Sequence, residues 1–473
     1  MNTFRREFLR SAAGVTLGFF GLRCFVGPKA QAQDYQNEGE AGLYGPLVPD
    51  PRRVFDLPRG FSYRIISRMR DVMSDGFRTP GAPDGMAAFA GPDGKILLVR
   101  NHELNPHQTF EGAFGVDLSL QAKVDSRKLY DAGSGQRPHM GGTTTLLYNP
   151  ATGEVEREYL SLAGTARNCA GGPTPWGSWI TCEETEDKRH AEDDEVENFN
   201  EKDHGYNFEV PARAEMRLTD PVPLKAMGRF RHEAVAVEPF SGIVYQTEDQ
   251  EDGLIYRFLP NEYGKLQAGG KLQALAVRDV KSCDTRNWAQ TGAPKLVVGE
   301  RLAVEWIDME DVDSPESDLR TRGFEKGAAR FARGEGMWYG NKEVFFACTS
   351  GGISKTGQVF RYLPSSHEGT SREAEASGTL ELYLEPNNTH LLEYCDNLCV
   401  APWGDLVLCE DGAEYNYLRG VTPEGRLYTI GNSAYHLHSE LCGVCFAPNH
   451  PTLFVNLQRP GLTLAITGPW NLT

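Results

Sequence analysis

A short hairpin pattern recurs six times along the chain and limits what it can fold into. Each copy has a polar, usually acidic, opening residue, a short apolar strand, a turn rich in Pro or Gly, a second apolar strand and a further acidic or amide residue. The copies start at Asp84, Asn168, Glu233, Glu335, Asp396 and Glu440. Hairpins that recur in this way, each followed by more β-rich sequence, are typical of a blade-by-blade β-propeller. We therefore predict an all-β protein, a six-bladed β-propeller.

The repeats also divide the chain. We predict a signal segment over 1–32, an N-terminal arm over 33–80 and a propeller over 81–473. A chain of 473 residues exceeds the usual size of one hydrophobic core, but a propeller grows by adding blades, so one large domain is sufficient. The arm ends in FSYRIISR, an alternating segment that predicts a strand. We expect this strand to close the propeller by pairing with the last blade.

The N-terminus has the features of an export signal. Arg5 and Arg6, followed by Phe8 and Leu9, match a twin-arginine signal, and the small residues up to Ala32 offer a cleavage site. The apolar segment between them is shorter than the roughly 20 residues needed to span a bilayer. The sequence therefore predicts a partnership with the twin-arginine export machinery, a periplasmic or secreted location and no stable membrane anchor.

The charge of the chain restricts its partners. Residues 1–32 have a net charge of +4, so their removal changes the formal charge from −17 to about −21. Such acidity argues against nucleic-acid binding, which needs a basic surface to neutralise phosphates. It favours cation binding and solubility, and we expect a monomer. The most charged run, from Glu184 to Asn207, predicts a solvated loop.

The repeat also predicts where polar side chains meet. The first strand of each propeller blade lines the central channel, so the residue that opens it faces the common axis. Cys169, Glu233, Glu335, Asp396 and Glu440 should then converge from separate blades. Converging carboxylates repel one another unless cations neutralise them, which indicates a metal site of hard oxygen ligands. A thiolate among them points to a metal softer than calcium as well.

Several motifs resemble one known family. RNCAGGPTPWGSWITCEET, HGYNFEVP, MGRFRHEAVAVEP, YQTED and DNLCVAPWGDL with CEDG are similar to segments of the PhoX-type alkaline phosphatases. The resemblance runs from about Asp84 to the last repeat and includes the twin-arginine signal. It implies a six-bladed propeller that holds ferric iron and calcium at its axis and hydrolyses small-molecule phosphate monoesters outside the cytoplasm.

The resemblance also implies roles for individual residues. The metal ligands of the family fall on Cys169, Glu184, Glu233, Glu335 and Asp396, with Cys169 bound to iron. Arg333, two residues before Glu335, would contact the substrate phosphate, although Arg330 is an alternative for this role. Second-strand ends carry further acids that could complete calcium shells: Glu183, Glu248, Asp249, Glu410 and Asp411.

Two other functions fit a six-bladed propeller. A calcium-dependent lactonase or esterase would need axial calcium and a His or Asp base, but it would not need Cys169. A non-enzymic propeller would bind partners through an exposed face and use the axial acids as a structural calcium site. The sequence has no dinucleotide-binding loop, Walker sequence or GxSxG elbow.

Overall fold

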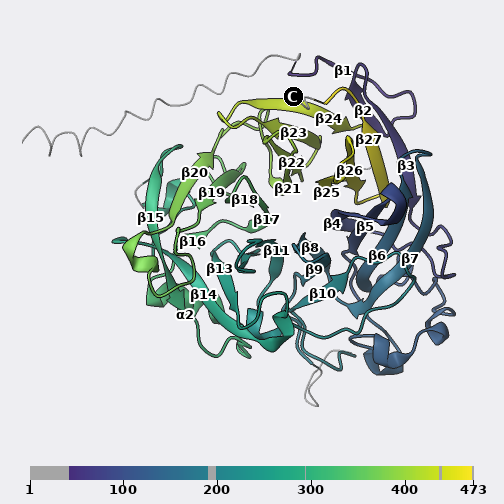
Figure 1. The fold of residues 1–473 in the computed structure, drawn as a ribbon, viewed down its shortest axis with the longest axis horizontal. Coiled ribbons are helices and arrows are strands. Elements are labelled where there is room, and N and C mark those ends of the chain that lie inside the picture. Colours follow the sequence, from purple (N-terminus) through teal and green to yellow (C-terminus); the bar gives the residue numbers. More distant parts are fainter. Residues whose placement is uncertain (1–41, 190–198, 293–294, 436–438, 471–473) are drawn as a thin grey trace, which may run out of the picture.

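The computed structural model describes residues 42–189, 199–292, 295–435 and 439–470. The predicted signal over 1–32, its cleavage site at Ala32 and residues 190–198 of the predicted charged loop lie outside these ranges. Antiparallel strands radiate from a central axis and follow one another around it in chain order (Figure 1). This arrangement confirms the predicted all-β propeller.

Six short strands surround the axis in the described part of the chain. They are β4 (Pro83–Ala90), β8 (Asn168–Pro173), β11 (His232–Val237), β17 (Gly334–Gly340), β21 (Cys395–Val400) and β25 (Leu441–Phe446). Each inner strand contacts the next, and β25 contacts β4, so the ring is closed (Figure 1). Every inner strand starts within two residues of a predicted repeat start, which confirms the hairpin pattern.

Each inner strand begins one blade. Blade one adds β5 (Ile96–His102), β6 (Gly141–Asn149) and β7 (Glu154–Thr165), and blade two adds β9 (Ser178–Glu183) and β10 (Asn207–Pro211). Blade three adds β12 (Val244–Glu248), β13 (Gly253–Pro260), β14 (Gly270–Val277) and β15 (Arg301–Asp308). Blade four adds β18 (Glu343–Cys348), β19 (Gln358–Leu363) and β20 (Thr379–Leu384). Blade five adds β22 (Leu406–Glu410), β23 (Tyr417–Val421) and β24 (Leu427–Ser433), and blade six adds β26 (Thr452–Leu457) and β27 (Leu462–Thr467).

The N-terminal arm belongs to the propeller. Its strand β3 (Ser62–Arg68) pairs antiparallel with β27, so the first and last parts of the chain share blade six, as predicted. The arm also contributes β2 (Phe55–Pro58), which pairs with β24, and β1 (Leu47–Val48), which pairs with β2. Blade five is therefore extended at its outer edge by strands that the sequence did not indicate.

Hydrogen bonding links two of the blades. The outer strand β15 pairs with β20 of blade four as well as with β14, so the described strands form five continuous sheets although they make six blades. The same region carries the short helix α2 (Leu319–Lys326) and the two-residue strand β16 (Arg330–Phe331), which pairs with β13.

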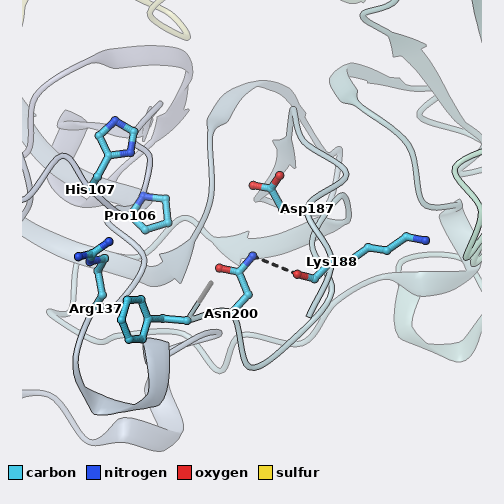
Figure 2. Close-up of a pocket in the computed structure, with 7 residues that line it drawn as sticks. Pro106, His107, Arg137, Asp187, Lys188 and Asn200 are labelled. Carbon is cyan, nitrogen blue, oxygen red and sulfur yellow. Dashed lines mark hydrogen bonds between the residues drawn. The ribbon is translucent and has the colours of Figure 1, made fainter. Parts of the chain in front are cut away.

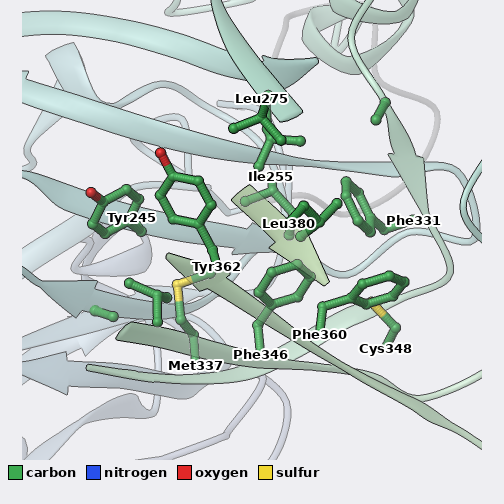
Figure 3. Packing of buried hydrophobic residues seen from close by; sticks show 14 of the residues in the cluster. Tyr245, Ile255, Leu275, Phe331, Met337, Phe346, Cys348, Phe360, Tyr362 and Leu380 are labelled. Atoms are coloured by element: carbon green, nitrogen blue, oxygen red, sulfur yellow. The ribbon is translucent and has the colours of Figure 1, made fainter. Parts of the chain in front are cut away.

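Neighbouring blades pack through their apolar faces. Between blades three and four, Tyr245 and Leu275 face Met337, Phe346 and Phe360 (Figure 3). Neighbouring inner strands also approach so closely at some positions that no side chain fits between them. A Cβ added at Gly172 would lie 2.0 Å from the carbonyl oxygen of Val235 in the next blade, so only glycine fits there.

A β-bulge occurs at the same place in all six blades. Where each inner strand pairs with its second strand, two residues oppose one, between the pairs Pro83/Met86, Asn168/Gly171, His232/Val235, Gly334/Met337, Cys395/Leu398 and Cys442/Cys445. A bulge bends its strand and changes the direction of a side chain. The first bulged residues are Asp84, Cys169, Glu233, Glu335, Asp396 and Gly443.

Candidate metal centre at the propeller axis

The bulges bring ligand-type side chains together. Ligand atoms of Glu233, Glu335 and Asp396, from three successive blades, lie within 4.8 Å of one another. Cys169 Sγ lies 2.7 Å from Glu233 Oε2. The structure therefore brings together four of the five residues that were predicted to converge, and all four lie at bulge positions.

Blade six differs from the prediction. Its bulge position is Gly443, and Glu440 lies three residues earlier, just before the inner strand. Glu440 nevertheless joins the cluster, because it shares the Nε2 group of Gln458 with Asp84 and Glu103. The distances from Gln458 Nε2 to Asp84 Oδ2 and to Glu103 Oε2 are both 3.0 Å.

A second set of residues comes from the ends of the second strands. The residue that follows this strand is Glu103, Glu184, Asp249, Thr349, Asp411 and Gln458 in blades one to six. Ligand atoms of Glu103, Cys169 and Glu184 lie within 4.8 Å of one another, as predicted for Cys169 and Glu184. Four of these residues are acids, whereas blade four has the hydroxyl of Thr349 and blade six has the amide of Gln458 at this position.

The prediction missed two members of this cluster, Asp84 and Glu103. Asp84 opens the first repeat, and Glu103 follows the first hairpin in the segment NHE, so both carried the same signal as the predicted residues. Asp84 is 2% exposed, and burial together with repulsion from Glu103 and Asp396 raises the pKa of its carboxyl well above the ordinary range.

Three of the suggested calcium ligands face elsewhere. Glu183 accepts hydrogen bonds from the backbone amides of Ala166 and Gly205, and Glu248 from the amide of Leu254 and the hydroxyl of Tyr256. Successive residues of a strand point to opposite sides, so these acids turn away from the axis while Glu184 and Asp249 turn toward it.

Glu410 behaves in the same way. It accepts hydrogen bonds from Arg419 Nε and from the backbone amides of Glu393 and Tyr417, whereas the next residue, Asp411, repels Asp396 at the axis. Of the suggested acids, the structure therefore brings only Asp249 and Asp411 to the cluster.

Two arginines form close ion pairs with the cluster, at hydrogen-bonding distance. Arg333 donates from Nε and Nη2 to Asp249 at 2.8 and 3.0 Å, and from Nη2 to Glu335 at 2.7 Å. Arg167 pairs with Glu184 and, at 2.7 Å, with Glu103. Arg330 instead pairs with Asp284 at 2.8 Å and stacks on Phe324. The structure thus places Arg333, and not Arg330, beside the predicted ligands.

The negative charges exceed these two positive charges. Nine carboxylates gather at the axis: Asp84, Glu103, Glu184, Glu233, Asp249, Glu335, Asp396, Asp411 and Glu440. Burial and repulsion by Asp411 raise the pKa of Asp396 to about 8, and burial with Asp249 and Glu103 raises the pKa of Glu184 to about 7, despite Arg167. Burial and Glu233 also raise the pKa of the Cys169 thiol. The cluster is therefore costly to ionise without added cations.

The two histidines beside the axial carboxylates serve the fold. His102 is bonded to the carbonyl of Gly81 at 2.8 Å and to Thr144 Oγ1 at 2.9 Å. His232 is bonded to the carbonyl of Gly228 at 3.0 Å and stacks on Phe230. Burial lowers the pKa of His232 to about 3, so its ring is neutral near neutral pH.

The channel is filled on the far side of the bulges. Trp338, three residues after Glu335, packs against four separate hydrophobic clusters of different blades. Only about 20 Å³ of space remains around it between the inner strands. Access to the cluster is therefore from the side where the second strands end.

A hollow lies near that entrance (Figure 2). It has a volume of about 280 Å³ and lies between the loops that follow β5 and β9, with Pro106 and His107 on one side and Asp187 on the other. Pro106 and Asp187 are three residues beyond Glu103 and Glu184, which limits each separation to roughly 11 Å between Cα atoms. The hollow therefore lies among loops that begin at the ends of these two second strands.

Solved structures resemble this one to different degrees, and the similarity to the first one below supports the fold. The structure of Pseudomonas fluorescens PhoX in complex with vanadate, a transition state analogue, is similar with a TM-score of 0.65 and 17% identity, covering 88% of this chain and 96% of that chain. A gluconolactonase from Xanthomonas campestris is similar with a TM-score of 0.36 and 12% identity, covering 90% and 98%. Virginiamycin B lyase from Staphylococcus aureus gives a TM-score of 0.35 and 11% identity, covering 86% and 99%.

Comparison of the sequence gives a more specific result. No curated protein matches it. The family model for alkaline phosphatase PhoX matches residues 42–461, which include the described arm and all six inner strands. Because that match spans most of the chain, the protein belongs to the PhoX family of alkaline phosphatases.

Proposed function

We propose that this phosphatase hydrolyses phosphate monoesters at an axial cluster of iron and calcium ions, and that it acts outside the cytoplasm. The observation that carries the proposal is the convergence of nine carboxylates and the Cys169 thiol at the propeller axis, opposed by two paired arginines. Family membership supports the phosphatase activity. The choice of metals rests on the chemistry of these ligands.

The residues fit the proposed ions. Glu233 Oε1 is buried and has no hydrogen-bond partner among the residues that the structure describes, and Glu233 Oε2 lies against Cys169 Sγ. A buried carboxylate oxygen without a partner is costly, and a cation between these groups would remove that cost. Cys169 with Glu184 and Glu233 would suit ferric iron, while Asp84, Glu335 and Asp396 offer the oxygens that calcium prefers.

Residues of the chain complete the site. When bound, the metal ions would supply Lewis acidity toward the phosphoryl group and offset its charge. Arg333 would donate paired N–H groups to the phosphate oxygens, because a guanidinium matches them geometrically. On the other side of the channel, Trp338 packs against residues of several blades.

Metal analysis together with an activity assay tests this proposal. Protein purified after export should contain iron and calcium, absorb visible light through a ferric–thiolate transition and hydrolyse a chromogenic phosphomonoester. Cys169→Ser should lose the absorption band. Calcium without iron would instead favour the calcium-dependent lactonase or esterase, and an inactive protein with calcium would favour a binding propeller.

Export is a separate part of the proposal. Arg5 and Arg6 would direct the folded, metal-loaded chain through the twin-arginine machinery, with cleavage after Ala32. The described residues contain no helix long and apolar enough to cross a membrane. A variant with Arg5→Lys and Arg6→Lys should accumulate as folded, active protein in the cytoplasm. Normal amounts of this variant outside the membrane would refute the twin-arginine route.

A further inference from the structure

Three successive blades carry an arginine at the same position. Arg167, Arg231 and Arg333 each lie two residues before the bulged residue of their inner strand, namely Cys169, Glu233 and Glu335. The equivalent residues of the other blades are Ala82, Tyr394 and Leu441. These three arginines therefore lie in adjacent blades on one side of the axial ring.

The three arginines differ in their contacts. Arg167 pairs with two carboxylates, and so does Arg333. Among the described residues, the side chain of Arg231 has a single ion-pair contact, from Nη2 to Glu184 Oε1 at 3.8 Å. This distance exceeds that of a hydrogen bond. The Arg231 side chain is also 37% exposed, so its guanidinium can reach a ligand without first breaking a close pair.

Arg231 nevertheless lies within the site. Glu184 Oε2 is 3.9 Å from Cys169 Sγ, so one carboxylate separates Arg231 from the central thiol. The backbone amide of Asp249 donates to the carbonyl of Arg231 at 3.1 Å, and the carboxylate of Asp249 accepts both bonds from Arg333. The segments carrying Arg231 and Arg333 therefore flank the same acid.

We infer that Arg231 is a second substrate-binding arginine, which acts with Arg333 on the phosphoryl group. This inference rests on the proposed phosphatase function. A phosphate monoester presents three non-bridging oxygens, and one guanidinium can engage two of them. A guanidinium from the adjacent blade supplies donors for the third oxygen. Because inorganic phosphate has the same groups, it should bind to Arg231 as well.

The test uses the metal-loaded full chain and three variants. Arg231→Ala removes the donors, Arg231→Lys keeps the charge without the planar fork, and Arg59→Ala is a control at an exposed arginine of the β2–β3 loop. We expect Arg231→Ala to raise KM for a chromogenic phosphomonoester and the inhibition constant of inorganic phosphate about 10- to 100-fold. Arg231→Lys should recover part of this loss, and Arg59→Ala should match the wild type.

Metal content and thermal stability distinguish binding from a structural role. Unchanged metal content and Tm in Arg231→Ala, together with weaker phosphate inhibition, support the inference. Wild-type KM and phosphate inhibition in Arg231→Ala would overturn it, as would a loss of metal that accounts for the whole defect. If the wild type hydrolyses no phosphomonoester, the proposed function fails. Calorimetric titration with inorganic phosphate then tests Arg231 alone, and equal affinities of wild type and Arg231→Ala would overturn its role.

Discussion

A substitution of Glu184 tests whether the axial carboxylates repel one another when no metal is bound. Its carboxylate is 5% exposed and faces Asp249 and Glu103 as well as Arg167. Burial and these acids raise its pKa from 4.5 to about 7. At Glu184 the folded protein therefore retains a proton that the unfolded chain releases, so the contribution of this residue to stability is most favourable below pH 4.5 and is lost as the pH rises through about 7.

The size of this loss in stability follows from the pKa shift of Glu184. A rise of this size corresponds to about 3 kcal/mol of unfolding free energy that is lost above pH 7. Glu184→Gln cannot ionise, so the metal-free variant should exceed the metal-free wild type by up to about 3 kcal/mol at pH 9 but by less than about 1 kcal/mol at pH 5. For a chain of this length, such a difference raises Tm by about 3 °C.

Thermal denaturation of chelator-treated protein from pH 5 to 9 provides the assay. Asp93→Asn, at an exposed turn, is a control that should follow the wild type at every pH. In metal-loaded protein the order should reverse, because Glu184→Gln removes a ligand. If metal-free Glu184→Gln is no more stable than the metal-free wild type at pH 9, the repulsion argument is refuted.

Further substitutions separate the roles of neighbouring residues. Arg333→Ala should retain its metals but lose roughly 2 to 4 kcal/mol of transition-state stabilisation, measured as kcat/KM; wild-type turnover would eliminate Arg333 as a phosphate contact. Asp249→Asn should lower metal content and activity, whereas Glu248→Gln should change metal content and activity little, because only Asp249 faces the axis. Gly336→Ala would place a Cβ 2.7 Å from the Cα of Asn397 and should cost about 1 to 3 kcal/mol in denaturant unfolding, and an unchanged midpoint would contradict this close strand packing.

The sequence predicted the features that depend on local pattern. The residue that opens each hairpin repeat can be recognised in the sequence because it precedes a run of strand-forming residues. Cys169, Glu233, Glu335 and Asp396 were therefore expected at the axis. The closing strand β3 was also predicted, because FSYRIISR alternates in the manner of a strand.

Features that depend on register were not predictable in the same way. A bulge inserts one residue without changing the apolar pattern, so the sequence pointed to Glu440 where the structure has Gly443 at the bulge position. For the adjacent acids Glu248 and Asp249, the direction of each side chain depends on where the strand ends, and the sequence does not define that point to one residue.

Contacts between distant segments were also missed. Gln458 links acids from two blades, and Arg231 owes its place to the packing of its segment beside Asp249. The pairing of β15 with β20 joins strands that are separated by the whole inner hairpin of blade four. None of these contacts has a periodic signal in the sequence.

The central claim is that the axial carboxylates and Cys169 bind metal ions. Anomalous X-ray diffraction from crystals of the exported protein, recorded on both sides of the iron absorption edge, tests it directly. The account predicts an iron peak within bonding distance of Cys169 Sγ and Glu233, and further density with calcium distances near Asp84, Glu335 and Asp396. An axis that contains only water, with Cys169 unbound in fully active protein, would contradict it.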